Sequence, residues 1–279
     1  AVQALMICPE QSNIVIDYFK KSFDYGTPTK NAEIAGRVAD SAIQLLNNNK
    51  IDQQKKKDFF DFASEKASKA VEENPLDFRN RLYWSSFLNQ GSAFFGGNDN
   101  VLLKEADKVL ADSEKLAPRK QLLYLEWGRV KSRLGDQNGA VEKFKAAVDL
   151  NTNVEETRWR LASAYVRAGR TAEGEAEAAE ARRILAESNS QAKINAASEL
   201  DLALAFKEKG LADKELEIMK NILANKDSLS DSYILIKLAE EFAGKGDKES
   251  AIAAARRVAE VNPSLQADTD KFIGQLGGH

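Results

Sequence analysis

The side chains that most often carry out catalysis are scarce in this sequence. Its single histidine is the last residue, His279, and its single cysteine is Cys8. Without an internal histidine, the chain lacks the usual general base, the Ser-His-Asp and Cys-His pairings and a histidine-based metal site. A lone cysteine is more typical of a small buried apolar residue than of a nucleophile. We therefore predict no catalytic residue, no metal and no cofactor.

Two other polar patterns also favour structure over chemistry. The stretch GGNDN at residues 96–100 lacks the alternating oxygen ligands and the closing glutamate of a calcium loop. The neighbouring carboxylates Glu155 and Glu156 stand at the start of a predicted helix, where they stabilise the helix dipole. No glycine-rich phosphate loop follows a strand, because no strand is predicted. The sequence therefore favours a binding or scaffold function.

The composition is that of a folded, helix-rich chain. Of its 279 residues, 43% are hydrophobic, 30% are charged and only five are proline. A formal net charge of −3 argues against general nucleic-acid binding. The longest apolar run, AVQALMIC, is about a third of a membrane span and has no basic flank. Because the chain begins with Ala1 instead of methionine, we expect a fragment or a processed product.

Apolar residues recur with the helical period over almost the whole chain, and no segment alternates as a strand does. Short breaks at Gly135, Gly169, Gly210 and Gly246 separate the later helices, and a glycine there favours a left-handed helix cap. None of the breaks is long enough to predict separate domains. The predicted helices cover residues 9–23, 31–48, 54–73, 77–90, 99–116, 119–134, 137–150, 155–168, 171–187, 191–209, 212–225, 229–244, 247–260 and 265–276.

The predicted helix at 54–73 has two interpretations. It begins with the three lysines 55–57 and continues through Phe59, Phe60 and Phe62. Such a segment could contact an anionic membrane surface. Aromatic residues at helical spacing are more typical of the core face of a helix, and we prefer that interpretation.

The spacing of the glycines indicates an internal repeat. Gly135 and Gly169 are 34 residues apart, and the next two intervals, to Gly210 and to Gly246, are 41 and 36 residues. A helix-turn-helix period of 34 residues is the signature of tetratricopeptide repeats. The residues at signature positions are Trp127, Gly128, Leu134, Gly135, Ala140, Phe144 and Ala147 in the clearest repeat, Leu161, Ala162, Tyr165, Gly169, Gly174, Ala178 and Ala181 in the next, and Leu238, Ala239, Phe242, Gly246, Ala251, Ala255, Val258 and Pro263 in the last. The chain resembles the tetratricopeptide repeat (TPR) family through these residues.

This resemblance implies an all-α fold, a TPR-type alpha-alpha superhelix that is a solenoid of helix-turn-helix repeats. We predict degenerate helical repeats at 1–73, TPR repeats at 74–118, 119–153, 154–190, 191–228 and 229–263, and a capping helix and tail at 264–279. Two repeats depart from the pattern, since Glu215 stands where a small residue belongs and QGSAFFGGNDN at 90–100 is an insertion. Small residues at signature positions are expected where two helices approach closely, with large residues filling the space beside them.

The first helices of such repeats form a concave surface, which is the usual binding face. The register predicts the following residues on it, here called the predicted face: Arg79, Leu82, Ser86, Leu122, Leu125, Arg129, Arg133, Trp159, Ser163, Arg167, Leu200, Leu204, Lys207, Tyr233 and Ile236. Apolar residues with an arginine in most repeats suit an extended peptide or an amphipathic helix that carries acidic groups. The alternative is that half of these leucines pack against neighbouring helices and the arginines are ordinary solvated residues. We predict a protein or peptide partner and no nucleic acid.

A narrower resemblance involves the openings of two repeats. The matching residues are Asn74, Pro75, Asp77, Arg79, Asn80 and Leu82 in one repeat, and Pro118, Arg119 and Gln121 in the next. In these positions the chain resembles the C-terminal TPR region of bacterial O-antigen ligase or polymerase-like membrane proteins. The resemblance implies a scaffold module of surface-polysaccharide assembly, tethered at the envelope on the extracytoplasmic side by a missing upstream segment.

Two alternatives stay open at this stage. One is a free-standing TPR adaptor, cytoplasmic or at the envelope, that assembles a secretion, pilus or cell-envelope complex. The other, the least favoured, is a glycan-acting enzyme domain. The coding sequence upstream of Ala1 distinguishes the tail from the adaptor, since the tail requires several hydrophobic spans in the same frame.

Overall fold

The computed structural model describes residues 12–24, 28–46, 51–95, 97, 100–188, 195–225 and 229–277. The chain divides into two compact units, Ala1–Leu150 and Asn151–His279, and each is described by itself. Cys8 and His279 lie outside the described residues, as do Gly96, Asn98 and Asp99 of the insertion. Fourteen α-helices occupy the described residues, which confirms the predicted all-α class.

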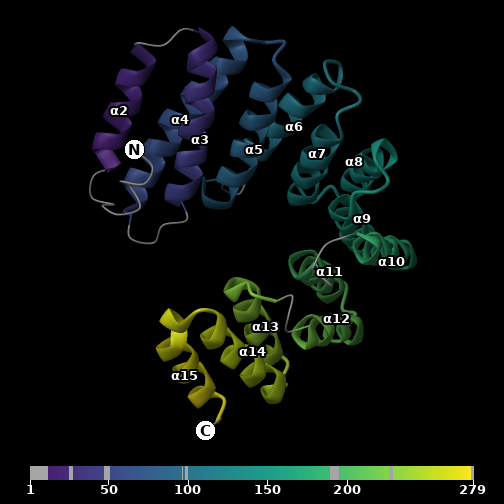
Figure 1. Cartoon of the computed structure of the whole chain (residues 1–279). Helices are drawn as coiled ribbons and strands as arrows, with labels where there is room; N and C mark the ends of the chain where they lie inside the picture. The colour runs from purple at the N-terminus through teal and green to yellow at the C-terminus, as the bar shows by residue number, and fades with distance from the viewer. Residues whose placement is uncertain are drawn as a thin grey trace. The chain divides into compact units, whose positions relative to one another are not determined.

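The first unit contains three helix pairs preceded by one further helix. The helices are α2 (Ser12–Asp24), α3 (Pro28–Leu46), α4 (Gln53–Glu73), α5 (Phe78–Phe95), α6 (Val101–Glu114), α7 (Gln121–Arg133) and α8 (Gln137–Leu150). Each pair, α3 with α4, α5 with α6 and α7 with α8, packs side by side along the chain (Figure 1). The first helices also contact one another, α3 with α5 and α5 with α7, so they form a continuous layer within this unit.

The second unit repeats the arrangement and closes it with a final helix. Its helices are α9 (Glu155–Arg167), α10 (Thr171–Glu187), α11 (Ala196–Glu208), α12 (Ala212–Ala224), α13 (Ser232–Gly244), α14 (Lys248–Val261) and α15 (Gln266–Gln275), with the 3-10 turn η3 (Pro263–Leu265) before the last. The first helices α9, α11 and α13 contact in series, and α15 packs on α14 (Figure 1).

The turns inside the later pairs are built as the glycine spacing predicts. Gly135, Gly169, Gly210 and Gly246 have φ angles of 81°, 82°, 72° and 77°. This left-handed region strains any residue with a Cβ, and it ends a helix by letting the following amides bond back to the last turn. After Gly135, for example, the amide of Asp136 donates to the carbonyl of Lys131 at 3.0 Å.

Small residues bring the helices of a pair close together, as expected from their positions in the repeat. A Cβ placed on Gly128 would lie 2.5 Å from the ring of Phe144. A Cβ on Gly174 would lie 2.8 Å from the backbone oxygen of Ala162. Ala140 and Ala147, on α8 with Phe144, are fully buried. A larger residue at either glycine position would therefore clash with a neighbouring side chain or backbone atom.

The aromatic residues of α4 belong to the core of the first unit. Phe59 and Phe60 are 1% and 2% exposed, and the buried Lys56 donates from Nζ to the carbonyl of Leu46 at 2.8 Å. Burial of the middle lysine favours the core interpretation of this helix over a membrane-surface one. Within the described ranges, no helix is both long enough and apolar enough to cross a bilayer.

The predicted end of α5 at residue 90 was wrong. The helix runs through Gln90 and Gly91 to Phe95, whose ring centroid lies 4.9 Å from that of Phe60. Half of the insertion is therefore helical, because its aromatic residues extend the hydrophobic face of α5 onto α4. The glycine at 91 does not break the helix, since Phe60 occupies the space next to it.

Candidate functional site

In the first unit, the predicted face divides into accessible and buried positions. Leu122 is 53% exposed and Arg79 is also exposed, whereas Leu125 is 8% exposed and belongs to the interior. The remaining members on α5 and α7 are the half-buried Leu82, Ser86 and Arg129 and the exposed Arg133. Leu122 is thus the accessible apolar side chain that α7 contributes to this face.

In the second unit, more of the predicted face is interior. Trp159, Ser163 and Leu200 are buried, because α9 and α11 pack directly against each other. The half-buried members are Arg167, Leu204 and Ile236, and the exposed members are Lys207 and Tyr233. Tyr233, 64% exposed at the start of α13, is the most accessible aromatic residue of this set.

The basic residues of the predicted face already have partners within the chain. The ion pairs are Arg79 with Asp77 (3.4 Å), Arg129 with Glu126 (3.4 Å), Arg167 with Asp201 (2.8 Å) and Glu208 (3.1 Å), and Lys207 with Glu241 (2.5 Å). Neighbouring carboxylates therefore offset much of the positive charge that was expected to recruit an acidic partner. The pairs of Arg167 and Lys207 join one first helix to the next.

A polar cluster that the sequence analysis missed ties α5 to α7. The buried Asn89 donates from Nδ2 to Oε1 of the buried Glu126 at 2.9 Å, and Arg133 donates to Oδ1 of Asn89 at 3.1 Å. Arg133 is exposed as a whole, but packing against Asn89 partly desolvates its guanidinium and lowers its pKa, and the charge of Glu126 offsets this effect only in part. Asn89 lies three residues after Ser86, so the same helical face would have identified it.

A second cluster ties α9 to α11. Arg167 donates to both Asp201 and Glu208, and Arg160 lies 4.0 Å from Asp201. Burial opposes ionisation of Asp201, but the charge of Arg167 and its hydrogen bond outweigh burial, so the pKa of Asp201 is lowered. This cluster is a fixed polar joint between two repeats, and its charges are largely satisfied.

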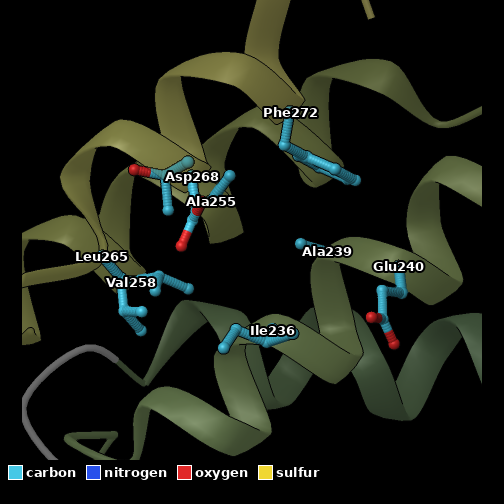
Figure 2. Close-up of a pocket in the computed structure, with 9 residues that line it drawn as sticks. Ile236, Ala239, Glu240, Ala255, Val258, Leu265, Asp268 and Phe272 are labelled. Atoms are coloured by element: carbon cyan, nitrogen blue, oxygen red, sulfur yellow. The ribbon is translucent and has the colours of Figure 1, made fainter. Parts of the chain in front are cut away.

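The predicted face also borders a pocket that the sequence analysis did not predict. A cavity of about 240 Å³ lies between α13, α14 and α15. Figure 2 shows Ile236 and Phe272 bordering it from opposite helices, with Glu240 at its edge. Its lining residues are Ile236, Ala239, Glu240, Ala255, Val258, Leu265, Asp268, Thr269 and Phe272. We call this cavity the C-terminal pocket.

A wider and more polar pocket lies in the first unit, between α3 and the start of α5. Its volume is about 530 Å³, and Arg79 of the predicted face lines it together with Tyr83, which is 56% exposed. Its two arginines are paired with adjacent carboxylates, Arg37 with Glu33 and Arg79 with Asp77. Among the described residues, no group of histidine, cysteine and carboxylate side chains could hold a metal ion.

Comparison with solved structures identifies the fold. A thermophilic TPR protein, TTC0263 from Thermus thermophilus, is 20% identical over 74% of this chain and 100% of its own, with a TM-score of 0.50. Two further structures have lower TM-scores. A MamA structure is 18% identical over 63% of this chain and 94% of its own, with a TM-score of 0.46. The Cut9-Hcn1 complex of the APC/C is 15% identical over 98% of this chain and 50% of its own, with a TM-score of 0.49.

The assignment rests on the first of these structures. No protein-family model and no curated protein matches the sequence. At this level of identity the similarity concerns the fold, and it leaves the partner of this chain open. The helix pairs, the glycine turns and the similarity to TTC0263 together show that this chain has the all-α helix-turn-helix repeat fold of tetratricopeptide repeat proteins.

Proposed function

We propose that this chain is a non-enzymatic protein-binding module that holds a peptide segment of its partner on the first helices of its repeats. The observation that carries the proposal is the surface of α13. Tyr233 is 64% exposed there, and Ile236, one turn further along, opens into the C-terminal pocket. Large apolar side chains exposed beside a cavity are typical of protein interaction sites.

The first unit offers a second, smaller point of contact. Leu122 of α7 is 53% exposed on the first-helix layer. Leu150, at the end of the second helix α8, is 40% exposed and provides a matched position outside that layer. The same substitution at these two leucines therefore tests whether the first helices bind.

The experiment compares Leu122→Glu with Leu150→Glu in the full chain. Each variant is used to capture partners from cells of the source organism, after circular dichroism has shown equal helix content. We expect Leu122→Glu to lose the captured partner and Leu150→Glu to retain it. Equal capture by both variants and by a Tyr233→Glu variant would exclude the first helices as the binding surface.

The finer proposal is that the module is the tail of an O-antigen ligase or polymerase-like membrane protein, held at the bacterial envelope. Its support is the sequence resemblance at residues 74–82 and 118–121 alone. In the structure, the side-chain amides of Asn74 and Asn80 both donate to the backbone carbonyl of Ala70. The carboxylate of Asp77 accepts from the backbone amide of Arg79. These hydrogen bonds lie at the end of α4 and at the start of α5. The turn between the two helices is therefore enough to explain the residue types at 74–80.

The alternative proposal is a free-standing adaptor of an envelope, pilus or secretion complex. Reading the coding sequence upstream of Ala1 separates the two. Several hydrophobic spans in frame would support the membrane-protein tail, and a nearby start codon would support the adaptor.

A further inference from the structure

We infer that the C-terminal pocket binds one bulky apolar side chain of a peptide in which a lysine or arginine stands next to that residue. This inference rests on the proposed function and deepens it, because it names the chemistry of the partner at one site. It depends on the origin of the pocket, its size and the charges at its rim.

The pocket lies beside a signature position where the last repeat, like the α9–α10 repeat with Ala178, has alanine in place of the phenylalanine of α8. In α7 and α8, the ring of Phe144 fills the space next to Gly128, sixteen residues earlier. The equivalent pair in α13 and α14 is Ala239 and Ala255, again sixteen residues apart. Two alanines leave this space to be filled by the next helix, and here α15 borders it without filling it. An unfilled apolar cavity lowers stability, so an apolar occupant is favoured there.

The volume and lining of the pocket suit a side chain better than a whole small molecule. At about 240 Å³, it is smaller than the roughly 300–1,000 Å³ of typical small-molecule sites. Ile236, Val258, Leu265 and Phe272 supply its apolar walls, and Ile236, Leu265 and Phe272 are only half-buried. A leucine, isoleucine, methionine or phenylalanine of a partner can therefore enter from solvent.

The rim of the pocket is acidic. Asp268 is exposed, and its carboxylate makes no hydrogen bond or ion pair with any other described residue. Glu240 is exposed and pairs with Lys237 at 2.7 Å, so its charge is partly offset. The unpaired carboxylate is complementary to a basic residue and repels an acidic one. A basic neighbour of the apolar anchor thus gains an ion pair at the rim, whereas an acidic neighbour is disfavoured.

The neighbouring surface favours a peptide over other occupants. Tyr233 lies one turn before Ile236 on α13 and is exposed, so a chain anchored in the pocket can continue across its ring. A small apolar molecule would use neither Tyr233 nor Asp268. A second copy of this chain would bring its own carboxylates to the same rim.

The test measures the binding of three labelled twelve-residue probe peptides to the full chain by fluorescence anisotropy. The peptides carry a central Lys-Leu-Lys, Lys-Ala-Lys or Glu-Leu-Glu in the same glycine-serine background. We expect the Lys-Leu-Lys peptide to bind roughly tenfold or more tightly than the Lys-Ala-Lys peptide, because the leucine buries about three more carbon groups. We expect the Glu-Leu-Glu peptide to bind several-fold more weakly than Lys-Leu-Lys.

Two variants with matched controls locate the binding. Ala255→Leu fills the pocket and should abolish the preference for leucine over alanine, whereas Ala253→Leu, exposed on the same helix, should leave it unchanged. Asp268→Lys should reverse the preference between the lysine and glutamate peptides, and Asp270→Lys should not. Asp268→Lys changes an exposed residue and should leave the fold intact. It therefore tests whether peptides bind at this rim even if Ala255→Leu fails to fold.

Several outcomes would overturn the inference. Equal affinity for the leucine and alanine peptides would show that the pocket is not an anchor site. A dimer in sedimentation experiments that Ala255→Leu dissociates would assign the pocket to a second copy of the chain. If Leu122→Glu abolishes partner capture while Ala255→Leu and Asp268→Lys do not, the pocket inference fails and the proposed function stands.

Discussion

The buried ion pair between Glu215 and Lys245 gives a sharp test of the repeat register. Glu215 occupies a position where the TPR pattern has a small residue, and its side chain is 1% exposed. It pairs at 2.5 Å with Lys245, which caps α13 and is 23% exposed. Its other oxygen, Oε1, has no hydrogen-bond partner among the described residues. The carboxylate is thus buried with one strong partner and incomplete hydrogen bonding.

The two halves of this pair should respond unequally to removal. Lys245→Ala leaves the carboxylate buried and unpaired, which costs about 3–5 kcal/mol at a fully buried site. Because Lys245 is 23% exposed, water can partly replace it, and we expect a loss of about 2–4 kcal/mol. Glu215→Ala restores the small residue and frees Lys245 to reach solvent, so we expect a change within about 1 kcal/mol.

Hydrogen exchange of the peptides from α12 and α13 measures these changes locally, which suits a chain of two compact units. In the Glu215→Ala background, Lys245→Ala should cost less than about 0.5 kcal/mol, since its partner is already gone. Equal losses of free energy of unfolding for the two single variants, with an additive double variant, would exclude a coupling between Glu215 and Lys245. That result would mean that the pair does not exist in solution.

Three further predictions follow from packing and charge. Ala140→Leu should overpack the fully buried α7–α8 contact and lower the free energy of unfolding by about 1–3 kcal/mol in urea titrations, whereas Ala172→Leu on the exposed side of α10 should change it by less than about 0.5 kcal/mol. Arg167→Glu should destabilise the second unit by about 2–3 kcal/mol, since it places a third carboxylate beside Asp201 and Glu208; a neutral result would contradict the polar joint. The pKa of Asp201 is lower in the folded chain than in the unfolded chain, so ionised Asp201 stabilises the fold above its unfolded-state pKa. This stabilisation is lost as the pH falls through the folded-state pKa. Arg167→Met should therefore reduce the acid sensitivity of α11, measured by hydrogen exchange between about pH 5 and 2.

These ion pairs also change how charge reversal on the predicted face must be interpreted. Substituting Arg129, Arg133 and Arg167 by glutamate would remove contacts to Glu126, Asn89 and Asp201 as well as any contact to a partner. Loss of capture in such a variant would report on folding as much as on binding. The matched leucine pair avoids this problem, because Leu122 and Leu150 are both exposed.

Most of the fold was predictable because its determinants are local in sequence. The helical period and the glycine caps at residues 135, 169, 210 and 246 fix where helices run and end. The error at the end of α5 arose because Gly91 and the following glycines have the composition of a loop. Only the packing of Phe95 on Phe60 shows that the helix continues.

The candidate site was predictable only in part. The helical register of the repeats places Leu125, Trp159 and Leu200 on the first-helix face. It does not show how closely the neighbouring first helix packs, and that packing buries these three side chains. The placement of the arginines on a binding face stays a prediction. Their carboxylate partners could not be assigned from the pattern, because those of Arg167 lie 34 and 41 residues away in the next repeat, whereas that of Arg129 lies three residues away on the same helix. The C-terminal pocket had only a weak signal in the sequence, since Ala255 stands where an earlier repeat has Phe144 but Ala178 occupies the same position in the α9–α10 repeat.

The partner is expected to bind on the side of the first helices, and not on the outer side of the second helices. The most direct measurement places a photo-crosslinking phenylalanine derivative at Tyr233 on α13 or at Ala253 on α14, both exposed residues of the same unit, and identifies adducts formed in cells. We expect a discrete protein adduct from position 233 and none from position 253. Equal labelling at both positions, or labelling at 253 alone, would contradict it.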